Sequence, residues 1–203
     1  MIDERLKAKD VIVFDVGNVL VRFDPKHIAG KIFSAEAYDR LYAGVFESGL
    51  WGIIDTGLMN MGLLAKKMCE AAHTDSPQDY MAVSDLLEHF YLYEHALNAS
   101  KWLPELKAMG KKLYYLSNYS EPGFTRTTSR FPFFQLFDGG VVSAHEFVCK
   151  PAPRIYQILC ERYGFAPEDA LFVDDNLGIV NAARALGFSV WHYTEGALEE
   201  VND

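Results

Sequence analysis

The stretch VIVFDVGNVLV, residues 11–21, decides the fold class of this chain. It opens with four apolar residues, three of them β-branched, which is typical of a strand buried on both faces of a sheet. Asp15, Gly17 and Asn18 follow at once, and these residue types favour a turn at the carboxyl end of the strand. The stretch therefore predicts a buried strand that ends at an aspartate.

Between about residues 24 and 95 the strand pattern disappears and helical spacing replaces it. Asn60 and Ser76 stand where helix N-caps are expected, and Pro77 takes the first helical position after Ser76. The apolar residues of two predicted helices recur at three- and four-residue intervals: Met61, Leu64, Met68 and Ala72, then Tyr80, Val83, Leu87 and Phe90. We interpret this segment as a helical insertion.

After residue 96, strands and helices alternate. Strands are predicted at 112–117, 140–143, 170–174 and 188–193, and helices at 102–109, 151–163 and 177–186. Such alternation favours a parallel sheet with right-handed crossovers. The predicted fold is α/β: a doubly wound, Rossmann-like core of residues 1–23 and 96–203, interrupted by a helical cap of residues 24–95.

The charge balance of the chain indicates which class of partner it can bind. The chain has 203 residues, with 19 Lys and Arg against 28 Asp and Glu, and a formal net charge of −9. An acidic excess argues against nucleic acid, because affinity for its backbone comes from basic side chains. A small phosphorylated molecule remains compatible, since a few local positive groups and a bound cation suffice to hold it.

The N-terminal residues carry no pattern of a targeting or membrane segment. MIDERLKAKD mixes both charges, and the apolar run after it is far too short to span a bilayer. The three cysteines, Cys69, Cys149 and Cys160, form no CxxC pair and indicate a reducing compartment. We expect a cytoplasmic protein without a membrane partner. No pattern predicts its oligomeric state.

Polar side chains follow the predicted strands at their carboxyl ends. In open α/β sheets, ligands bind beyond these ends, near the point where the strand order reverses. We therefore expect one edge of the sheet to gather the candidate site residues: Asp15, Ser117, Asn118, Asp174 and Asp175, with Lys150 just before a proline-started helix.

Three carboxylates in one cleft repel one another unless a cation joins them. An oxygen-rich cluster without sulfur suits Mg²⁺, which takes one or two carboxylates together with waters and substrate phosphate. A metal-bound phosphate beside a carboxylate indicates phosphoryl transfer. An aspartate nucleophile would form an aspartyl-phosphate that water then hydrolyses.

Four segments carry a resemblance to a known family: FDVGNVL (14–20), LSNYS (116–120), KPAPRIY (150–156) and FVDDNLGIVNAARALG (172–187). In order and spacing they resemble the four motifs of the haloacid dehalogenase superfamily. The resemblance spans nearly the whole chain and includes a cap inserted after the first motif, as in capped subfamily I. The first motif is similar to that of glucose-1-phosphatase-like sugar phosphatases.

The resemblance implies a role for each matched position. Asp15 would be the nucleophile and a metal ligand, and the backbone carbonyl of Gly17 would also contact the metal. Ser117 and Asn118 would hold phosphoryl oxygens, and Lys150 would neutralise nucleophile and phosphate together. Asp175 falls on the main metal ligand of the fourth motif, and Asp174, just before it, would be a second ligand or its anchor.

The sequence departs from the superfamily pattern at a position important for proton transfer. Phosphatases of the superfamily usually have an aspartate, serving as general acid and base, where this chain has Gly17. Asp24, where the chain enters the cap, is a candidate replacement. Asn18 and Val19 stand where Gly and Thr are usual, and Gly178–Ile179 lacks the second acid of the fourth motif.

The leading hypothesis is a Mg²⁺-dependent phosphatase for a small phosphorylated metabolite, with sugar phosphates as the expected class. One alternative is a dehalogenase, in which an aspartate attacks carbon and no metal is needed. The other is a non-catalytic relative that binds a phosphorylated ligand or a protein partner, as the departures around Gly17 suggest.

Overall fold

The core of the molecule is a single parallel sheet. A computed structural model describes residues 3–194. The sheet has five strands in the order β5-β4-β1-β6-β7, and all neighbouring pairs are parallel. The strands are β1 (Val11–Phe14), β4 (Lys112–Ser117), β5 (Gly139–Val142), β6 (Ala170–Asp174) and β7 (Ser189–His192).

The strand predicted from residues 11–21 is the central strand of this sheet. Its last residue, Phe14, is in register with Tyr115 of β4 on one side and Val173 of β6 on the other. Val13 packs into the core on one face, while Ile12 and Phe14 pack into the core on the opposite face. Burial on both faces explains why the segment is apolar throughout rather than alternating.

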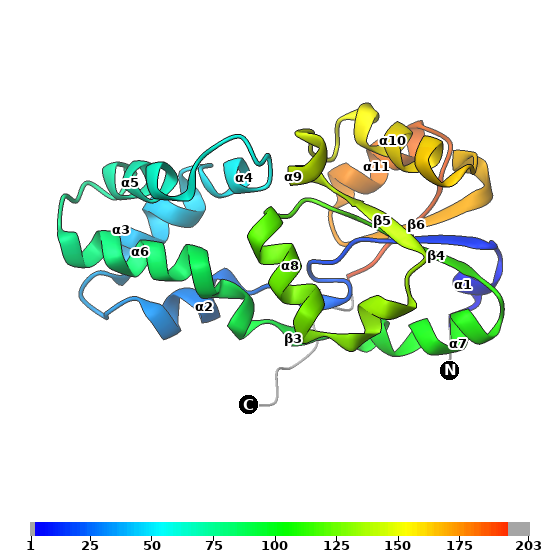
Figure 1. The fold of residues 1–203 in the computed structure, drawn as a ribbon, viewed down its shortest axis with the longest axis horizontal. Helices are drawn as coiled ribbons and strands as arrows, with labels where there is room; N and C mark the ends of the chain where they lie inside the picture. Colours follow the sequence, from blue (N-terminus) through cyan, green and yellow to red (C-terminus); the bar gives the residue numbers. More distant parts are fainter. Residues whose placement is uncertain (1–2, 195–203) are drawn as a thin grey trace.

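Helices cover both faces of the sheet, which confirms the predicted α/β class (Figure 1). Helices α10 (Pro153–Tyr163) and α11 (Leu177–Ala185) bury Ile155, Tyr156 and Ala183 against one face. Helix α7 (Leu103–Ala108) contributes Leu103 and Leu106 to the other face, where α8 (Glu121–Arg130) also packs. The short elements around this core are α1 (Glu4–Lys7), α9 (Ser143–Glu146), and the 3₁₀ turns at Asn98–Trp102, Pro132–Leu136 and Pro167–Asp169.

A separate group of helices lies between β2 (Val21–Arg22) and β3 (His95–Ala96), at the left of Figure 1. These two short strands pair antiparallel, so the chain enters and leaves the group at one place. The group consists of α2 (Pro25–Ile32), α3 (Tyr38–Tyr42), a π-helical turn (Ala43–Glu47), α4 (Trp51–Ile54), α5 (Met61–Ala71), α6 (Pro77–His89) and a 3₁₀ turn (Phe90–Tyr93).

The helix starts in this group agree with the predicted N-caps. The Asn60 side chain accepts hydrogen bonds from the backbone N–H groups of Gly62 and Leu63 at the start of α5. The Ser76 hydroxyl accepts one from the N–H of Asp79 at the start of α6. Both caps satisfy donors that a helix leaves open in its first turn.

Some boundaries differ from the sequence expectations. Helix α10 begins at Pro153, not at Pro151, and β5 covers Gly139–Val142, one residue earlier than predicted. The β2–β3 ladder was not predicted, because strands of two residues have no periodicity of their own and exist through pairing with a distant segment.

The strand order creates the crevice in which a ligand is expected. From β1 the chain proceeds outward through β4 to β5 on one side, then returns to β6 and β7 on the other. The carboxyl ends of β4, β1 and β6 therefore meet at the point where the order reverses. No helix within residues 3–194 combines the length and apolar character needed to cross a bilayer.

Candidate active site

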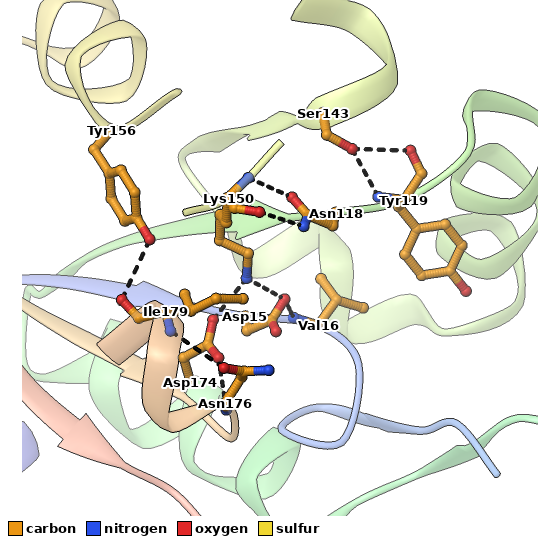
Figure 2. A network of polar contacts seen from close by, with 10 residues as sticks. All are labelled: Asp15, Val16, Asn118, Tyr119, Ser143, Lys150, Tyr156, Asp174, Asn176 and Ile179. Carbon is orange, nitrogen blue, oxygen red and sulfur yellow. Dashed lines mark hydrogen bonds and ion pairs between the residues drawn. The ribbon is translucent and has the colours of Figure 1, made fainter. Parts of the chain in front are cut away.

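A buried lysine lies at the centre of the crevice (Figure 2). The Lys150 Nζ is 2.9 Å from Asp15 Oδ1 and 2.6 Å from Asp174 Oδ2. Burial lowers the pKa of Lys150, but the two carboxylates outweigh burial and raise the pKa above its usual value. The ammonium group is therefore charged at neutral pH.

Asn118 positions this lysine through the backbone. Its side-chain Oδ1 accepts a hydrogen bond of 2.7 Å from the Lys150 N–H, and its Nδ2 donates one of 3.0 Å to the Lys150 carbonyl. The family resemblance predicts that Asn118 holds phosphoryl oxygens. In the structure its side-chain amide joins the end of β4 to the segment before α10.

Asp15 presents one carboxylate oxygen to the cavity without a partner. Its Oδ1 accepts from the Val16 N–H at 2.7 Å as well as from Lys150. Its backbone N–H donates to the carbonyl of Val173 at 2.8 Å, which anchors the residue to β6. No hydrogen bond within residues 3–194 engages Oδ2, so this oxygen is available to attack an electrophile.

Asp15, Asp174 and Asp175 form one acidic cluster. Each offers a carboxylate oxygen, and these oxygens lie within 4.8 Å of one another. Asp174 is fully buried, with Oδ2 on Lys150 and Oδ1 accepting from the Asn176 N–H at 2.9 Å. Burial, and then the charge of Asp15, raise the pKa of Asp175 to about 6. The positive charge of Lys150 opposes this rise without cancelling it.

The cluster fits a divalent cation of the hard, oxygen-preferring type. All three donors are carboxylates, and among the described residues no thiolate or imidazole belongs to the group. One lysine faces three acids, so the donor set retains net negative charge for a cation to balance. The residues present therefore fit the predicted Mg²⁺.

These groups line one cavity of about 390 Å³. Ser117 is buried, and its hydroxyl has no hydrogen-bond partner among the described residues, so it is available to a ligand. The structure brings together the predicted site residues that reach this cavity: Asp15, Gly17, Ser117, Asn118, Lys150 and Asp175. Asp174 lies beneath them, in contact with Lys150.

The turn after β1 explains how the chain tolerates its departures from the family pattern. Asn18 has a φ of 53°, in the left-handed region where asparagine is the best substitute for glycine. Its side-chain oxygen also accepts from the Phe23 N–H at 3.1 Å. A Cβ added at Gly17 would meet nothing within 4 Å. The absent acid at Gly17 is therefore not a consequence of crowding.

Asp24, the candidate replacement for that acid, serves another purpose. Its Oδ1 accepts from the N–H groups of Lys26 and His27, both at 3.1 Å, and so caps α2. Burial raises the pKa of Asp24, but these N–H groups and Arg22 outweigh it and hold the pKa below its usual value. Asp24 is not among the residues that line the cavity. A low pKa and engaged oxygens do not suit a proton donor.

Asp55 is an acid of this cavity that the sequence did not reveal. It follows α4, and its carboxylate makes no hydrogen bond or ion pair with any described residue. Burial, and then the charge of Asp15, raise the pKa of Asp55 to about 7, against the opposing effect of Lys150. Its backbone carbonyl accepts a 2.5 Å hydrogen bond from Ser143 Oγ, which fixes the loop to the sheet.

Comparison with known proteins identifies the family of this chain and solved structures with a similar fold. Residues 9–187 match the sequence profile of haloacid dehalogenase-like hydrolases. A sesquiterpene phosphatase of Aspergillus oryzae is 33% identical over 93 residues, which cover 46% of this chain and 47% of that protein. An (S)-2-haloacid dehalogenase of Pseudomonas putida is 29% identical over 127 residues, covering 62% of this chain and 55% of that protein.

The chain thus spans about half the length of these curated relatives. Among solved structures, a haloacid dehalogenase family enzyme of Bacteroides thetaiotaomicron, in complex with magnesium and inorganic phosphate, has a TM-score of 0.69. Its identity is 18%, and the match covers 91% of this chain and 93% of that one. At this identity the likeness concerns the fold.

Proposed function

The chain belongs to the haloacid dehalogenase-like hydrolases, and from this premise we propose that it is a Mg²⁺-dependent phosphatase of small phosphorylated metabolites. The observation that carries the proposal is the arrangement of charge around Asp15. One oxygen of this carboxylate is held by Lys150 and the Val16 N–H, while the other has no partner among the described residues. A free Ser117 hydroxyl lines the same cavity.

In the first chemical step, Asp15 Oδ2 attacks the phosphorus of a phosphomonoester. The bond between phosphorus and the ester oxygen breaks, and an aspartyl-phosphate forms on Asp15. Lys150 and the Ser117 hydroxyl are suited to hold the phosphoryl oxygens, on which negative charge is spread in the transition state. Asn118 keeps the lysine in place through its two hydrogen bonds to the Lys150 backbone.

The departing alcohol needs a proton, and Asp55 is suited to supply it. Its raised pKa of about 7 keeps a fraction of the acid protonated near neutral pH. In the second step, water attacks phosphorus, the bond between Asp15 and phosphorus breaks, and inorganic phosphate leaves. Asp55, now ionised, takes the proton from this water and so returns to its starting state.

Asp15, Asp175 and the Gly17 carbonyl would hold the Mg²⁺, with Asp174 as a further ligand or as the anchor of Lys150. When bound, the cation supplies positive charge that neutralises the phosphate and screens the carboxylates from one another. The Bacteroides thetaiotaomicron structure contains magnesium and inorganic phosphate, which supports the choice of cation and of ligand class.

Residues 24–95 would act as the cap that encloses the substrate over a core of residues 1–23 and 96–203. Specificity would then depend on the cap residues that line the cavity: Trp51, Asp55 and Phe90. Phe23, just before the cap begins, lines the cavity beside them. The resemblance to glucose-1-phosphatase-like enzymes makes sugar phosphates one substrate class to test.

The charge of the cavity argues against a dehalogenase. A 2-haloacid carries a carboxylate of its own, and Asp15, Asp55 and Asp175 already line the cavity against the single cation of Lys150. No arginine is among the lining residues of the described chain. A phosphomonoester is also anionic, but it is compatible with the cluster once Mg²⁺ is bound.

The test is phosphate release from a panel of phosphomonoesters, with Mg²⁺ and with EDTA. We expect turnover that requires Mg²⁺ and falls by at least about 10³-fold in Asp15→Asn. Asp75→Asn, an exposed acid of the helical group, is the matched control and should retain activity. Halide release from 2-haloacids that is insensitive to EDTA, without phosphatase activity, would establish the dehalogenase instead.

A further inference from the structure

The cavity has two chemically different sides. The sheet side carries the charged and hydroxyl groups that suit a phosphate. Four aromatic rings form the other side of the lining: Phe23, Trp51, Phe90 and Tyr119. A substrate whose phosphate lies against Asp15 must place its alcohol portion among these rings.

The rings contact one another and form a continuous wall. Trp51 stacks on Phe23 with centroids 5.3 Å apart and meets Phe90 edge-on at 5.5 Å. Phe90 in turn lies 6.0 Å from the ring of Tyr119. Behind the wall, Phe46 lies 4.8 Å from Trp51 and supports it. The wall combines residues from the cap and from the end of β4, so it is a preformed apolar surface.

Polar atoms are scarce on this side. The Tyr119 hydroxyl donates to Glu94 Oε1 and lies 2.9 Å from Thr127 Oγ1, so only the ring remains for a ligand. Apart from the groups assigned to the phosphate and the cation, the polar lining residues of the described chain are Asp55, Trp51 through its indole N–H, Asn18 and Asn176. The side-chain oxygens of both asparagines already accept backbone N–H groups.

A sugar phosphate does not match this surface. Each buried hydroxyl of a sugar needs a hydrogen-bond partner, and an unpaired one weakens binding. These few polar groups cannot serve the several hydroxyls of a hexose, because Asp55 is already assigned to the ester oxygen and both asparagine oxygens are already hydrogen-bonded. An apolar alcohol loses nothing in such surroundings and gains from leaving water.

We propose that the substrates are phosphomonoesters of hydrophobic alcohols, whose apolar portion packs against Phe23, Trp51 and Phe90. This inference rests on the phosphatase activity proposed above and specifies its substrate class. The phosphate lies on the sheet side, at Asp15, Ser117 and Lys150. The ester oxygen lies within reach of Asp55, and the carbon skeleton occupies the ring-lined side.

The test compares two esters of equal ring size and equal leaving-group type: cyclohexylmethyl phosphate and glucose 6-phosphate. Both release a primary alcohol from a six-membered ring, so they differ chiefly in the hydroxyls. We expect kcat/KM for cyclohexylmethyl phosphate to exceed that for glucose 6-phosphate by at least about 10-fold, mainly through KM. A hexose phosphate preferred by the wild type overturns the substrate class and leaves the phosphatase proposal intact.

A third ester, 4-nitrophenyl phosphate, distinguishes a failure of the proposed substrate class from a failure of the phosphatase proposal. If none of the three esters is hydrolysed with Mg²⁺ present, the phosphatase proposal fails and the substrate class fails with it. The wild-type comparison needs no variant, so its result does not depend on whether an altered chain folds.

Trp51→Gln then tests the wall itself by placing an amide in it. We expect KM for cyclohexylmethyl phosphate to rise about 10-fold, while KM for glucose 6-phosphate stays unchanged or falls. Met81→Ala removes an exposed apolar side chain of the cap, 69% accessible, and is the matched control. Equal changes of KM for both esters in Trp51→Gln contradict the assigned contact.

Discussion

Lys150 shows how a single residue organises the site. Its ammonium group lies between Asp15 and Asp174, and its backbone is paired with the Asn118 side chain. A buried ion pair of this kind contributes little net stability, because desolvation offsets the attraction between charges. The ion pair instead positions Asp15, because Lys150 holds one carboxylate oxygen of Asp15 and leaves the other free to react.

Asp55→Asn tests the proposed proton donor. An amide of the same size cannot donate a titrating proton, so we expect kcat for alkyl phosphates to fall by about 10²- to 10⁴-fold. The loss should be much smaller for 4-nitrophenyl phosphate, whose leaving group departs without protonation. The measurement is kcat across a series of esters with different leaving-group pKa values.

A second substitution, at Gly17, extends the test of the proton donor. Because a Cβ at Gly17 meets nothing within 4 Å, Gly17→Asp should restore an acid near the ester oxygen. We expect Gly17→Asp to recover part of the activity lost in Asp55→Asn. Asp24→Ala is the comparison: loss of its cap on α2 should cost about 0.5–2 kcal/mol of stability and leave the dependence on leaving group unchanged. An equal loss on all esters in Asp55→Asn contradicts the proton-donor role.

Among the structural elements, the loop after α4 joins the helical group to the sheet close to the site. Ser143, at the start of α9, donates to the Asp55 carbonyl and accepts from the Tyr119 N–H at 3.0 Å. Two residues after Asp55, Gly57 has a φ of 67° and packs against the backbone of Ala144. These contacts determine where Asp55 lies relative to Asp15.

Gly57→Ala should disturb this contact. The added Cβ would lie 2.6 Å from the Ala144 carbonyl oxygen, so the loop must move away from α9. We expect kcat/KM to fall by about 10-fold or more, since small displacements of catalytic groups are costly. The measurement is kcat/KM, together with the free energy of unfolding.

Gly110→Ala is the matched control for backbone strain. Gly110 also has a positive φ, 79°, but a Cβ there meets nothing within 4 Å. Both variants should lose about 1–2 kcal/mol of stability from the left-handed backbone, and only Gly57→Ala should lose activity. Equal activity in the two variants would mean that the contact with Ala144 does not position the site.

For the molecule as a whole, Glu94 links the exit of the helical group to the sheet. It is 1% exposed, accepts from the Tyr119 hydroxyl, and accepts from Thr127 Oγ1 at 2.7 Å. Burial raises the pKa of Glu94 to about 7, even though both hydrogen bonds oppose the rise. Tyr119 lines the cavity, so this buried acid also supports the ring-lined wall.

The stability of the protein should therefore fall as pH rises from about 4.5 through about 7. A carboxyl group whose pKa is higher in the folded than in the unfolded state stabilises the fold below the unfolded value of 4.5, and this contribution is lost as pH rises through about 7. The full effect corresponds to about 3 kcal/mol. Glu94→Gln, which stays neutral, should flatten the curve of unfolding free energy between about pH 5 and 8.

Urea unfolding at several pH values measures this curve. Glu88→Gln, an exposed acid at the end of α6, is the control and should leave the curve as in the wild type. An unchanged pH dependence in Glu94→Gln would falsify the assignment of the effect to this residue. Asp55 and Asp175 also have raised pKa values, so some dependence should persist in the variant.

Much of the core was predictable because its signals are local. The strand at 112–117 and the strand at 170–174 were predicted with their observed bounds, since continuous apolar runs flanked by polar residues define them. The polar residues at the carboxyl ends of these strands and directly after β1 predicted the edge where Asp15, Ser117 and Asp175 meet. Strand ends in a parallel sheet necessarily converge, so sequence position is sufficient there.

The sequence by itself determined the fold class, the helical insertion and the acids at the strand ends, because hydrophobic period and turn chemistry act over a few residues. Only the tertiary structure decided which acid of the insertion reaches the cavity. It assigned Asp24 to capping α2 and brought Asp55 beside Asp15. It also joined Phe23, Trp51, Phe90 and Tyr119 into one wall. These residues are far apart in sequence, and their proximity follows from packing between elements, which no local pattern encodes.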